Sequence, residues 1–195
     1  MNIYIDFDDT FTNSIQALLA ISNRRYGTSY KIEDVGDWNF KDIYPNIPLK
    51  EIVSIYDTDE FYNLLSIKRD ALFVLRRFAK RNKIFIVTKV NKRSMVQKFQ
   101  WIKEHIQNFG IDVELIGIPL NKSKGIVDMS EGIMIDDNVK FLNETNAKYK
   151  ILFKNNRKFD ELQEWSGMSA TSWQELEKIL YNIISKEKGI TNGKI

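Results

Sequence analysis

Apolar and polar positions follow two periods along the chain, one typical of buried strands and one typical of amphipathic helices. Short apolar runs rich in β-branched residues predict strands at 3–8, 83–88, 113–118, 133–135 and 149–153. Between these runs, apolar residues recur three and four positions apart, which predicts helices. The alternation of strands with helices favours an α/β fold, in which a doubly wound parallel sheet has helices on both faces.

The clearest helical pattern runs from Met95 to Phe109, and its apolar face includes Phe99 and Ile102. A second helix is expected to begin after Thr12 or Asn13, both frequent N-cap residue types, and to end at Gly27, since glycine is a frequent helix stop. Further helices are predicted at 49–56, 60–65, 71–79, after 138 and at 172–186.

One connection is far longer than the fold requires. The first two strands are joined by a segment from Asp9 to Asn82, whereas a parallel crossover needs only about a dozen residues. The excess is rich in aromatic residues and is interrupted by Pro45 and Pro48. We therefore expect a small helical cap, residues 16–66, inserted into a core of residues 1–15 and 67–195. It would lie at the carboxyl ends of the strands, where open α/β sheets bind ligands.

The amino-acid composition excludes several kinds of functional site. The chain of 195 residues has no cysteine and one histidine, which excludes disulfides, thiolate metal sites and multi-histidine sites. The net charge of +3 is too small to predict binding to a nucleic-acid polymer. No apolar stretch reaches the roughly 18 residues of a membrane span, and the first residues lack the basic and apolar pattern of a signal peptide. A cytoplasmic location with no membrane partner is the expectation.

Polar residues gather where the predicted strands end. Asp6 and Asp8 follow the first strand, Thr88 the second, and Asp136 and Asp137 a later one. Each alone is typical of a turn or a helix cap. Together, at one edge of one sheet, the carboxylates would repel each other unless a divalent cation neutralised them, and oxygen-only ligands suit Mg²⁺. A hydroxyl and an ammonium beside that cation are suited to a phosphate group.

These segments resemble a known family. Asp6-Phe7-Asp8-Asp9-Thr10, Thr88, a later lysine and Ile135-Asp136-Asp137 are similar, in this order, to the four motifs of haloacid dehalogenase superfamily phosphatases. The resemblance covers about residues 1–155. It implies a nucleophile at Asp6, which becomes an aspartyl-phosphate, and a general acid and base at Asp8.

The same resemblance implies a Mg²⁺ site and a phosphate site. The cation would be held by the Asp6 carboxylate, the main-chain carbonyl of Asp8 and the pair Asp136 and Asp137. Thr88 and a lysine would bind the phosphoryl group. Lys124 is the lysine predicted from its distance before the acid pair, with Lys122 and Lys89 as alternatives.

Within the superfamily, the chain looks most like the 5′(3′)-deoxyribonucleotidases and their phage and bacterial relatives. This implies a small-molecule phosphate monoester as substrate, a (deoxy)ribonucleoside monophosphate, and allows a homodimer. The aromatic residues predicted to contact the base are Trp38, Phe40, Phe61 and Tyr62. One motif departs from the pattern, because the family commonly has Asp-x-Asp-Gly-Val where this chain has Asp9-Thr10.

Three alternatives remain. The chain could be a phosphatase of the same superfamily that acts on a sugar phosphate, on phosphoglycolate or on a polynucleotide end. It could be a receiver-like signalling module that accepts a phosphoryl group on aspartate, although the order of its acids, threonine and lysine differs from that class. It could also be an inactive protein of the same fold, which the intact Asp6, Asp8 and Thr88 argue against.

Overall fold

Six parallel strands form one sheet in the order β3-β2-β1-β4-β5-β6 in the computed structural model, which describes residues 1–189. This confirms the predicted α/β class with a doubly wound parallel sheet. The strands are β1 (Asn2–Ile5), β2 (Lys83–Val90), β3 (Glu114–Pro119), β4 (Gly132–Asp136), β5 (Tyr149–Phe153) and β6 (Met168–Ala170). The short edge strand β6 was missed by the sequence pattern.

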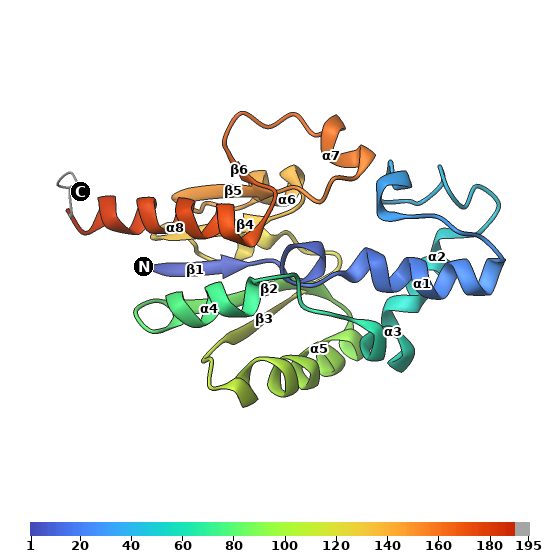
Figure 1. Ribbon diagram of the computed structural model, residues 1–195, viewed down its shortest axis with the longest axis horizontal. Helices are drawn as coiled ribbons and strands as arrows, with labels where there is room; N and C mark the ends of the chain where they lie inside the picture. The colour runs from blue at the N-terminus through green and yellow to red at the C-terminus, as the bar shows by residue number, and fades with distance from the viewer. Residues whose placement is uncertain (190–195) are drawn as a thin grey trace.

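The helices that connect and cover the sheet are α4 (Ala71–Ala79), α5 (Lys92–His105), α6 (Val139–Glu144), α7 (Lys158–Leu162) and α8 (Trp173–Glu187). Three more lie between β1 and α4, namely α1 (Ser14–Tyr26), α2 (Leu49–Val53) and α3 (Asp59–Leu64). Single turns complete the elements: η1 (Phe7–Phe11), η2 (Ile32–Asp34), η3 (Ser54–Asp57), η4 (Gln107–Phe109) and η5 (Lys124–Ile126). Figure 1 shows α1, α2 and α3 beyond the carboxyl end of β1, while the N-terminus and the end of α8 lie on the opposite side.

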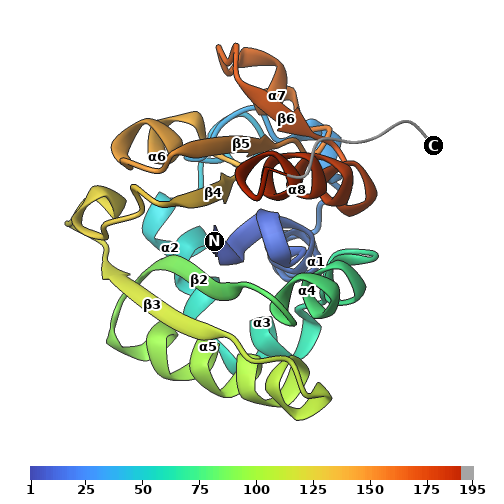
Figure 2. The ribbon, with the colours of Figure 1, turned by 90° about the vertical axis from the view of Figure 1, so that its left-hand side faces the viewer.

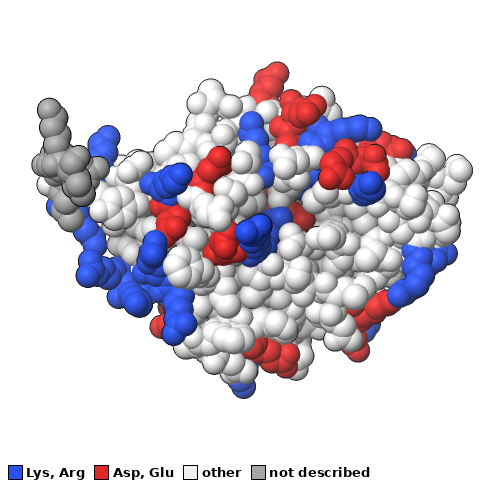
Figure 3. Space-filling view, viewed as in Figure 1, with Lys and Arg blue, Asp and Glu red and all other residues white. Residues whose placement is uncertain are grey.

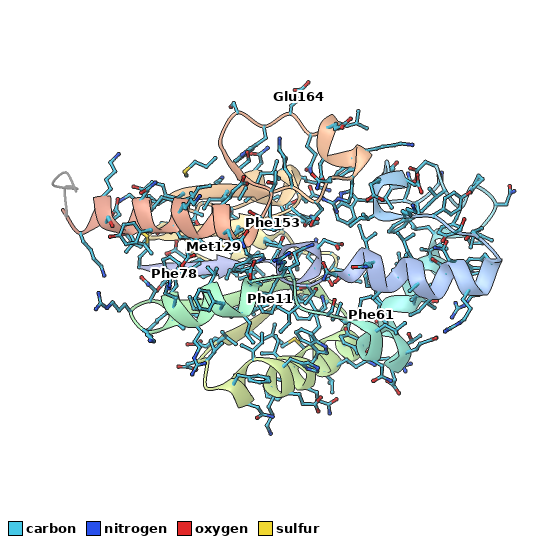
Figure 4. All side chains as sticks on the ribbon, in the orientation of Figure 1. Phe11, Phe61, Phe78, Met129, Phe153 and Glu164 are labelled. Carbon is cyan, nitrogen blue, oxygen red and sulfur yellow. The ribbon has the colours of Figure 1, made fainter. Side chains whose placement is uncertain are left out.

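The alternation of side chains along each strand builds a core on either face of the sheet. Ile3 and Ile5 point into the larger core, which α4, α5 and α8 cover, and Tyr4 points into the smaller one with Met134 and Leu142. Figure 2 shows α4 and α8 on one side of the sheet and α6 on the other. Phe11 and Phe153, both labelled in Figure 4, pack around Trp173 at the start of α8. Because both faces of the sheet are buried, the strand sequences are near-continuous apolar runs.

Strand β1 lies at the point where the strand order reverses. Ile5 pairs with Ile86 of β2 on one side and with Ile135 of β4 on the other. The residues that follow these three positions therefore emerge at one edge of the sheet, which is the edge where open α/β sheets bind ligands.

Local signals placed the boundaries of α1 well. Asn13 is its N-cap residue, and Gly27 ends it in the left-handed conformation, with φ of 65°. Glycine favours this conformation because it has no Cβ atom to clash with the backbone. The predicted helix ending at Gly27 is thereby confirmed, and of its two candidate N-cap residues the structure has Asn13.

The predicted apolar face of α5 was right at Ile102 and Ile106, which are buried, and wrong at two phenylalanines. Phe99 is 53% exposed and Phe109 is 58% exposed, whereas Lys98 and Trp101 are buried. The helix ends at His105 and is followed by the turn η4. The buried side of α5 is rotated toward Lys98 because the ammonium of that residue has partners at the sheet edge, described below.

The long segment between β1 and β2 contains α1, η2, α2, η3, α3 and α4. It has its own buried residues, among them Phe40, Ile52 and Phe61, which belong to the larger core cluster. The division into a core of residues 1–15 and 67–195 and a cap of residues 16–66 stays a prediction.

On the face shown in Figure 3, acidic and basic residues form small groups of both signs separated by uncharged residues, in keeping with the small net charge. Among residues 1–189, no helix is long and apolar enough to cross a membrane.

Candidate active site

The two aspartates after β1 lie at the carboxyl edge of the sheet. The backbone N–H of Asp6 still donates to Ile135 O of β4, at 2.9 Å, so the strand pairing holds this residue in place. The Asp6 side chain is almost fully buried, whereas the Asp8 side chain is 29% exposed. Of the two carboxylates, Asp8 is therefore the one more accessible to solvent. Its Oδ1 accepts a hydrogen bond from Ser14 Oγ, at 2.8 Å.

Asp9 explains the departure from the family's first motif. Its backbone is left-handed, with φ of 54° and ψ of 1°, at the position where the family commonly has glycine. Aspartate tolerates this conformation better than most residues because its short carboxylate bonds locally. Here Asp9 Oδ1 accepts from the backbone N–H of Ile15, at 3.0 Å. The turn into α1 is thus built without glycine.

The ammonium of Lys124 lies between two of the acids. Lys124 Nζ donates to Asp6 Oδ1 and to Asp136 Oδ2, the latter at 2.7 Å, and the side chain is fully buried. Lys122 is exposed, and the Lys89 ammonium lies 5.4 Å from the centre of the Phe141 ring. Of the three lysines considered from sequence, the one that contacts the acids is Lys124.

A second buried lysine was not foreseen. Lys98, on α5, donates to Asp8 Oδ2 and to Thr88 Oγ1, the latter at 2.7 Å, and is 4% exposed. Thr88 itself is fully buried at the end of β2. The sequence signal was the spacing of Lys98, four residues after Ser94 and three before Trp101. This spacing puts all three on the side of α5 that packs inward.

Three carboxylates could hold a metal ion. One oxygen from each of Asp6, Asp136 and Asp137 lies within 4.8 Å of the others, and all three residues are buried. The donor set consists of oxygen alone, which fits Mg²⁺. Asp137 also accepts a hydrogen bond from Arg157 Nη1, at 2.8 Å. Arg157 was not singled out from the sequence.

Burial governs the ionisation of these acids. Desolvation raises the pKa of Asp6 and of Asp136 to about 7, with Lys124 opposing the rise in both. Desolvation raises the pKa of Asp137 to about 8, against the attraction of Arg157. For Lys124, burial alone would lower the pKa, but the carboxylates of Asp136 and Asp6 outweigh it and raise the pKa. The cluster is short of positive charge, which favours a cation.

The aromatic residues predicted to contact a base have different places. Phe40 and Phe61 are buried among the apolar residues of the insertion, and Figure 4 shows Phe61 on α3. Their rings offer no exposed face in this structure. Trp38 packs edge to face on Phe159, with ring centres 5.3 Å apart, and the Tyr62 hydroxyl donates to Ser94 O at 3.5 Å.

A fifth aromatic residue belongs with these. Burial raises the pKa of the Tyr56 phenol, and the charges of Asp9, Asp8 and Asp137 raise it further. The pKa of Tyr62 is raised by burial and then by Asp8. The charge of Asp8 therefore raises the pKa of two tyrosines of the insertion.

The chain is a hydrolase of the haloacid dehalogenase superfamily. This class combines a parallel sheet of this strand order with an aspartate pair after β1, a threonine after β2, a buried lysine and an acid pair after β4. Within that class, residues 1–188 match the family model described as "5' nucleotidase, deoxy (Pyrimidine), cytosolic type C protein" (NT5C), and the chain belongs to this family. It is accordingly a phosphomonoester hydrolase. No curated protein sequence is similar enough to count as a match.

Solved structures agree on the fold. A haloacid dehalogenase-like hydrolase from Streptococcus pneumoniae is 14% identical with a TM-score of 0.57, over 91% of this chain and 97% of that one. A HAD-superfamily hydrolase of subfamily IA from Geobacter sulfurreducens is 12% identical with a TM-score of 0.55, over 92% and 95%. A Bacillus subtilis HAD-hydrolase, described as bound to magnesium, is 9% identical with a TM-score of 0.55, over 92% and 98%.

Proposed function

We propose that this protein removes the phosphate group from (deoxy)ribonucleoside monophosphates, in a Mg²⁺-dependent reaction that passes through an aspartyl-phosphate at Asp6. The observation that carries the proposal is the convergence of Asp6, Asp8, Thr88 and two buried lysines at one edge of the sheet, below the insertion. Membership of the 5′-nucleotidase family supports the substrate class.

Asp6 and Asp8 have the positions needed for two successive steps. A carboxylate oxygen of Asp6 forms a bond to phosphorus while the bond from phosphorus to the ester oxygen breaks, and protonated Asp8 gives its proton to that oxygen. Water then attacks phosphorus and gives a proton back to Asp8, while the bond to Asp6 breaks. The greater exposure of Asp8 supports this division, because the acid must reach both the leaving group and water.

The two lysines and Thr88 would bind the phosphoryl oxygens. Lys98 and Thr88 are already hydrogen-bonded to each other, and Lys124 is in contact with Asp6. An anionic nucleophile and an anionic phosphate repel each other, so fixed positive charge at both sides lowers the barrier. The second lysine strengthens the case for a phosphate ester over a neutral substrate.

The residues that would hold Mg²⁺ are Asp6, Asp136 and Asp137, with the main-chain carbonyl of Asp8. When bound, the ion would screen the charge that develops on the phosphoryl oxygens. Using the Asp8 carbonyl would leave its side chain free to carry a proton.

The base would lie against aromatic residues of the insertion. Burial and the charge of Asp8 both raise the pKa of Tyr56 and of Tyr62, which supports a place for these two rings of the insertion near Asp8. Stacking of a base on an aromatic ring contributes on the order of 1–3 kcal/mol in nucleic-acid complexes. This supports a nucleotide over a small phosphorylated acid.

The test is a phosphate-release screen over deoxyribonucleoside and ribonucleoside monophosphates, sugar phosphates, phosphoglycolate and p-nitrophenyl phosphate, with Mg²⁺ or with EDTA. We expect nucleotides to be preferred and EDTA to abolish turnover. Asp6→Asn, which is nearly isosteric, should lose all turnover. Asp8→Asn should lose roughly 10²–10⁴-fold, and least on p-nitrophenyl phosphate, whose leaving group needs little protonation.

Each part of the proposal can fail on its own. Preference for sugar phosphates would overturn the substrate and leave the phosphatase. Full activity after exhaustive chelation would overturn the cation. An Asp6→Asn variant that keeps more than a few per cent of activity would remove Asp6 from its role as nucleophile.

A further inference from the structure

The two acids after β4 pair with different positively charged side chains. Asp136 accepts from Lys124 and from the backbone N–H of Asn138, at 3.0 Å. Asp137 instead accepts at Oδ2 from Arg157, and its main-chain oxygen accepts from Gln163 Nε2 at 2.9 Å. Among residues 1–189, Asp137 Oδ1 accepts no hydrogen bond. One oxygen of this carboxylate is therefore anchored and the other is free to meet a cation.

Arg157 is itself fixed from its far side. It is 1% exposed, and its Nη2 and Nε donate to Asp160 Oδ1 at 2.7 and 3.2 Å. Asp160 Oδ2 in turn accepts from the backbone N–H groups of Asn155 and Arg157, at 2.8 and 2.9 Å. The guanidinium thus joins two carboxylates through a planar fork, a geometry that lysine does not reproduce.

The same guanidinium lies over two aromatic rings, one of them in the insertion. Arg157 Cζ lies 4.8 Å from the centre of the Trp38 ring and 5.6 Å from that of Phe159. The backbone N–H of Phe159 also donates to Val35 O, at 3.3 Å. The segment from Val35 to Trp38 therefore rests on the start of α7, with Arg157 between it and Asp137.

Charge alone does not account for this arginine. A positive group one hydrogen bond from a candidate ligand of a divalent cation repels that cation, so it weakens binding unless it improves the geometry of the ligand. Groups that hydrogen-bond to metal-ligating carboxylates orient them, and losing one typically weakens metal binding or activity by 10- to 100-fold.

We propose that Arg157 is a positioning residue that orients Asp137 for the cation, and that its stack on Trp38 couples this orientation to the docking of residues 35–38 on α7. The proposal rests on the cation site of the proposed function. It gives Trp38 a role other than contact with the base. Docking of residues 35–38 and assembly of the cation site would then depend on one shared side chain.

The experiment measures Mn²⁺ binding to the metal-free protein by electron paramagnetic resonance, without substrate, so that its outcome does not depend on turnover. Arg157→Lys keeps the charge and removes the fork, and we expect Mn²⁺ to bind roughly 10- to 100-fold more weakly. Trp38→Leu touches none of the acids, and we expect Mn²⁺ binding roughly three- to thirtyfold weaker, from the lost cation–π contact. In the double variant the two losses should not add.

Arg77→Lys is the matched control. Arg77 also stacks on a ring, that of Phe73 at 4.9 Å, and pairs with Glu177, but on the outer face of α4 and α8. Its substitution should leave the Mn²⁺ affinity unchanged.

Wild-type affinity in Arg157→Lys would overturn the positioning role, and wild-type affinity in Trp38→Leu would overturn the coupling. If Arg157→Lys does not fold, as judged by circular dichroism, Trp38→Leu still decides the coupling. Absence of Mn²⁺ binding in the wild type would overturn this inference together with the cation site. Metal binding without turnover of any phosphate ester would overturn the proposed function alone.

Discussion

Asp9 is the residue at which the backbone leaves β1 and turns toward α1. Its φ of 54° is costly for residues with a Cβ atom, and its side chain is fully buried. The hydrogen bond from Ile15 N–H to Asp9 Oδ1 compensates in part, while Asp9 Oδ2 has no partner among residues 1–189. Desolvation raises the pKa of this carboxyl, with Arg157 opposing the rise. Local geometry and buried charge therefore act against each other at one position.

We expect the free energy of unfolding of Asp9→Gly to exceed that of Asp9→Ala by about 1–2 kcal/mol. Alanine has a Cβ atom, which is unfavourable in the left-handed conformation, and glycine has none. Urea unfolding of both variants measures the difference. Gly27→Ala is the control, since Gly27 has φ of 65° and open space around its Cβ position, so only the backbone cost remains. Equal stability of the two Asp9 variants would show that the turn relaxes to another conformation.

Helix α5 illustrates how an element is oriented by a polar contact. Its apolar pattern favoured a buried Phe99, yet Phe99 is exposed and Lys98 is buried. Burial of an ammonium is unfavourable unless it is paired, and Lys98 is paired with Asp8 and Thr88. Trp101, one turn further on, packs edge to face on Phe7 with ring centres 5.4 Å apart. The helix is thereby fixed against the first motif.

We expect Lys98→Met to lower kcat/KM by roughly ten- to a hundredfold, the effect of losing a hydrogen bond to a charged group of about 1.5–3 kcal/mol. Methionine keeps most of the volume and the apolar stem. Steady-state kinetics on a nucleotide and on p-nitrophenyl phosphate should show the same loss for both, because both carry the phosphate group. Lys103→Met, an exposed position on the same helix, is the control. A loss confined to the nucleotide would assign Lys98 to the nucleoside instead.

At the scale of the whole molecule, the site concentrates buried acids at the carboxyl ends of the two central strands, β1 and β4. Folding raises the pKa of Asp6 and Asp136 to about 7 and that of Asp137 to about 8, from 3.8. Between about pH 4 and pH 8 the folded chain binds more protons than the unfolded chain, so the free energy of unfolding falls as pH rises. The stability these groups contribute is present below about pH 4 and is lost as pH rises through about 7 to 8.

We therefore expect the metal-free protein to lose stability between pH 5 and pH 8, and Asp137→Asn to lose less, because the amide does not titrate. Urea unfolding in EDTA at several pH values measures this. Mg²⁺ should restore stability most at the alkaline end, since the carboxylates must lose their protons before they bind a cation. Asp112→Asn, at an exposed position, is the control. A pH dependence of the wild type that Asp137→Asn reproduces would contradict the assignment.

The short edge strand β6 and the five-residue helix α7 were not predicted. Each spans few residues, so periodicity has little to act on. The segment between them contains Gln163, whose amide contacts the main-chain oxygen of Asp137. Missing this part of the chain meant missing the surroundings of the acid pair.

The sequence by itself determined the strands β1 to β5, the helix α1 with its end at Gly27, and the order in which Asp6, Thr88, Lys124 and Asp136 reach one edge of the sheet. These follow from periodicity, capping and the geometry of parallel strands, which act locally or by rule. Only the tertiary structure decided that Lys98 turns inward, that Phe61 is core and that Arg157 joins Asp137 to Trp38. Those contacts join segments far apart in the chain, and their energy depends on packing and desolvation that no local pattern contains.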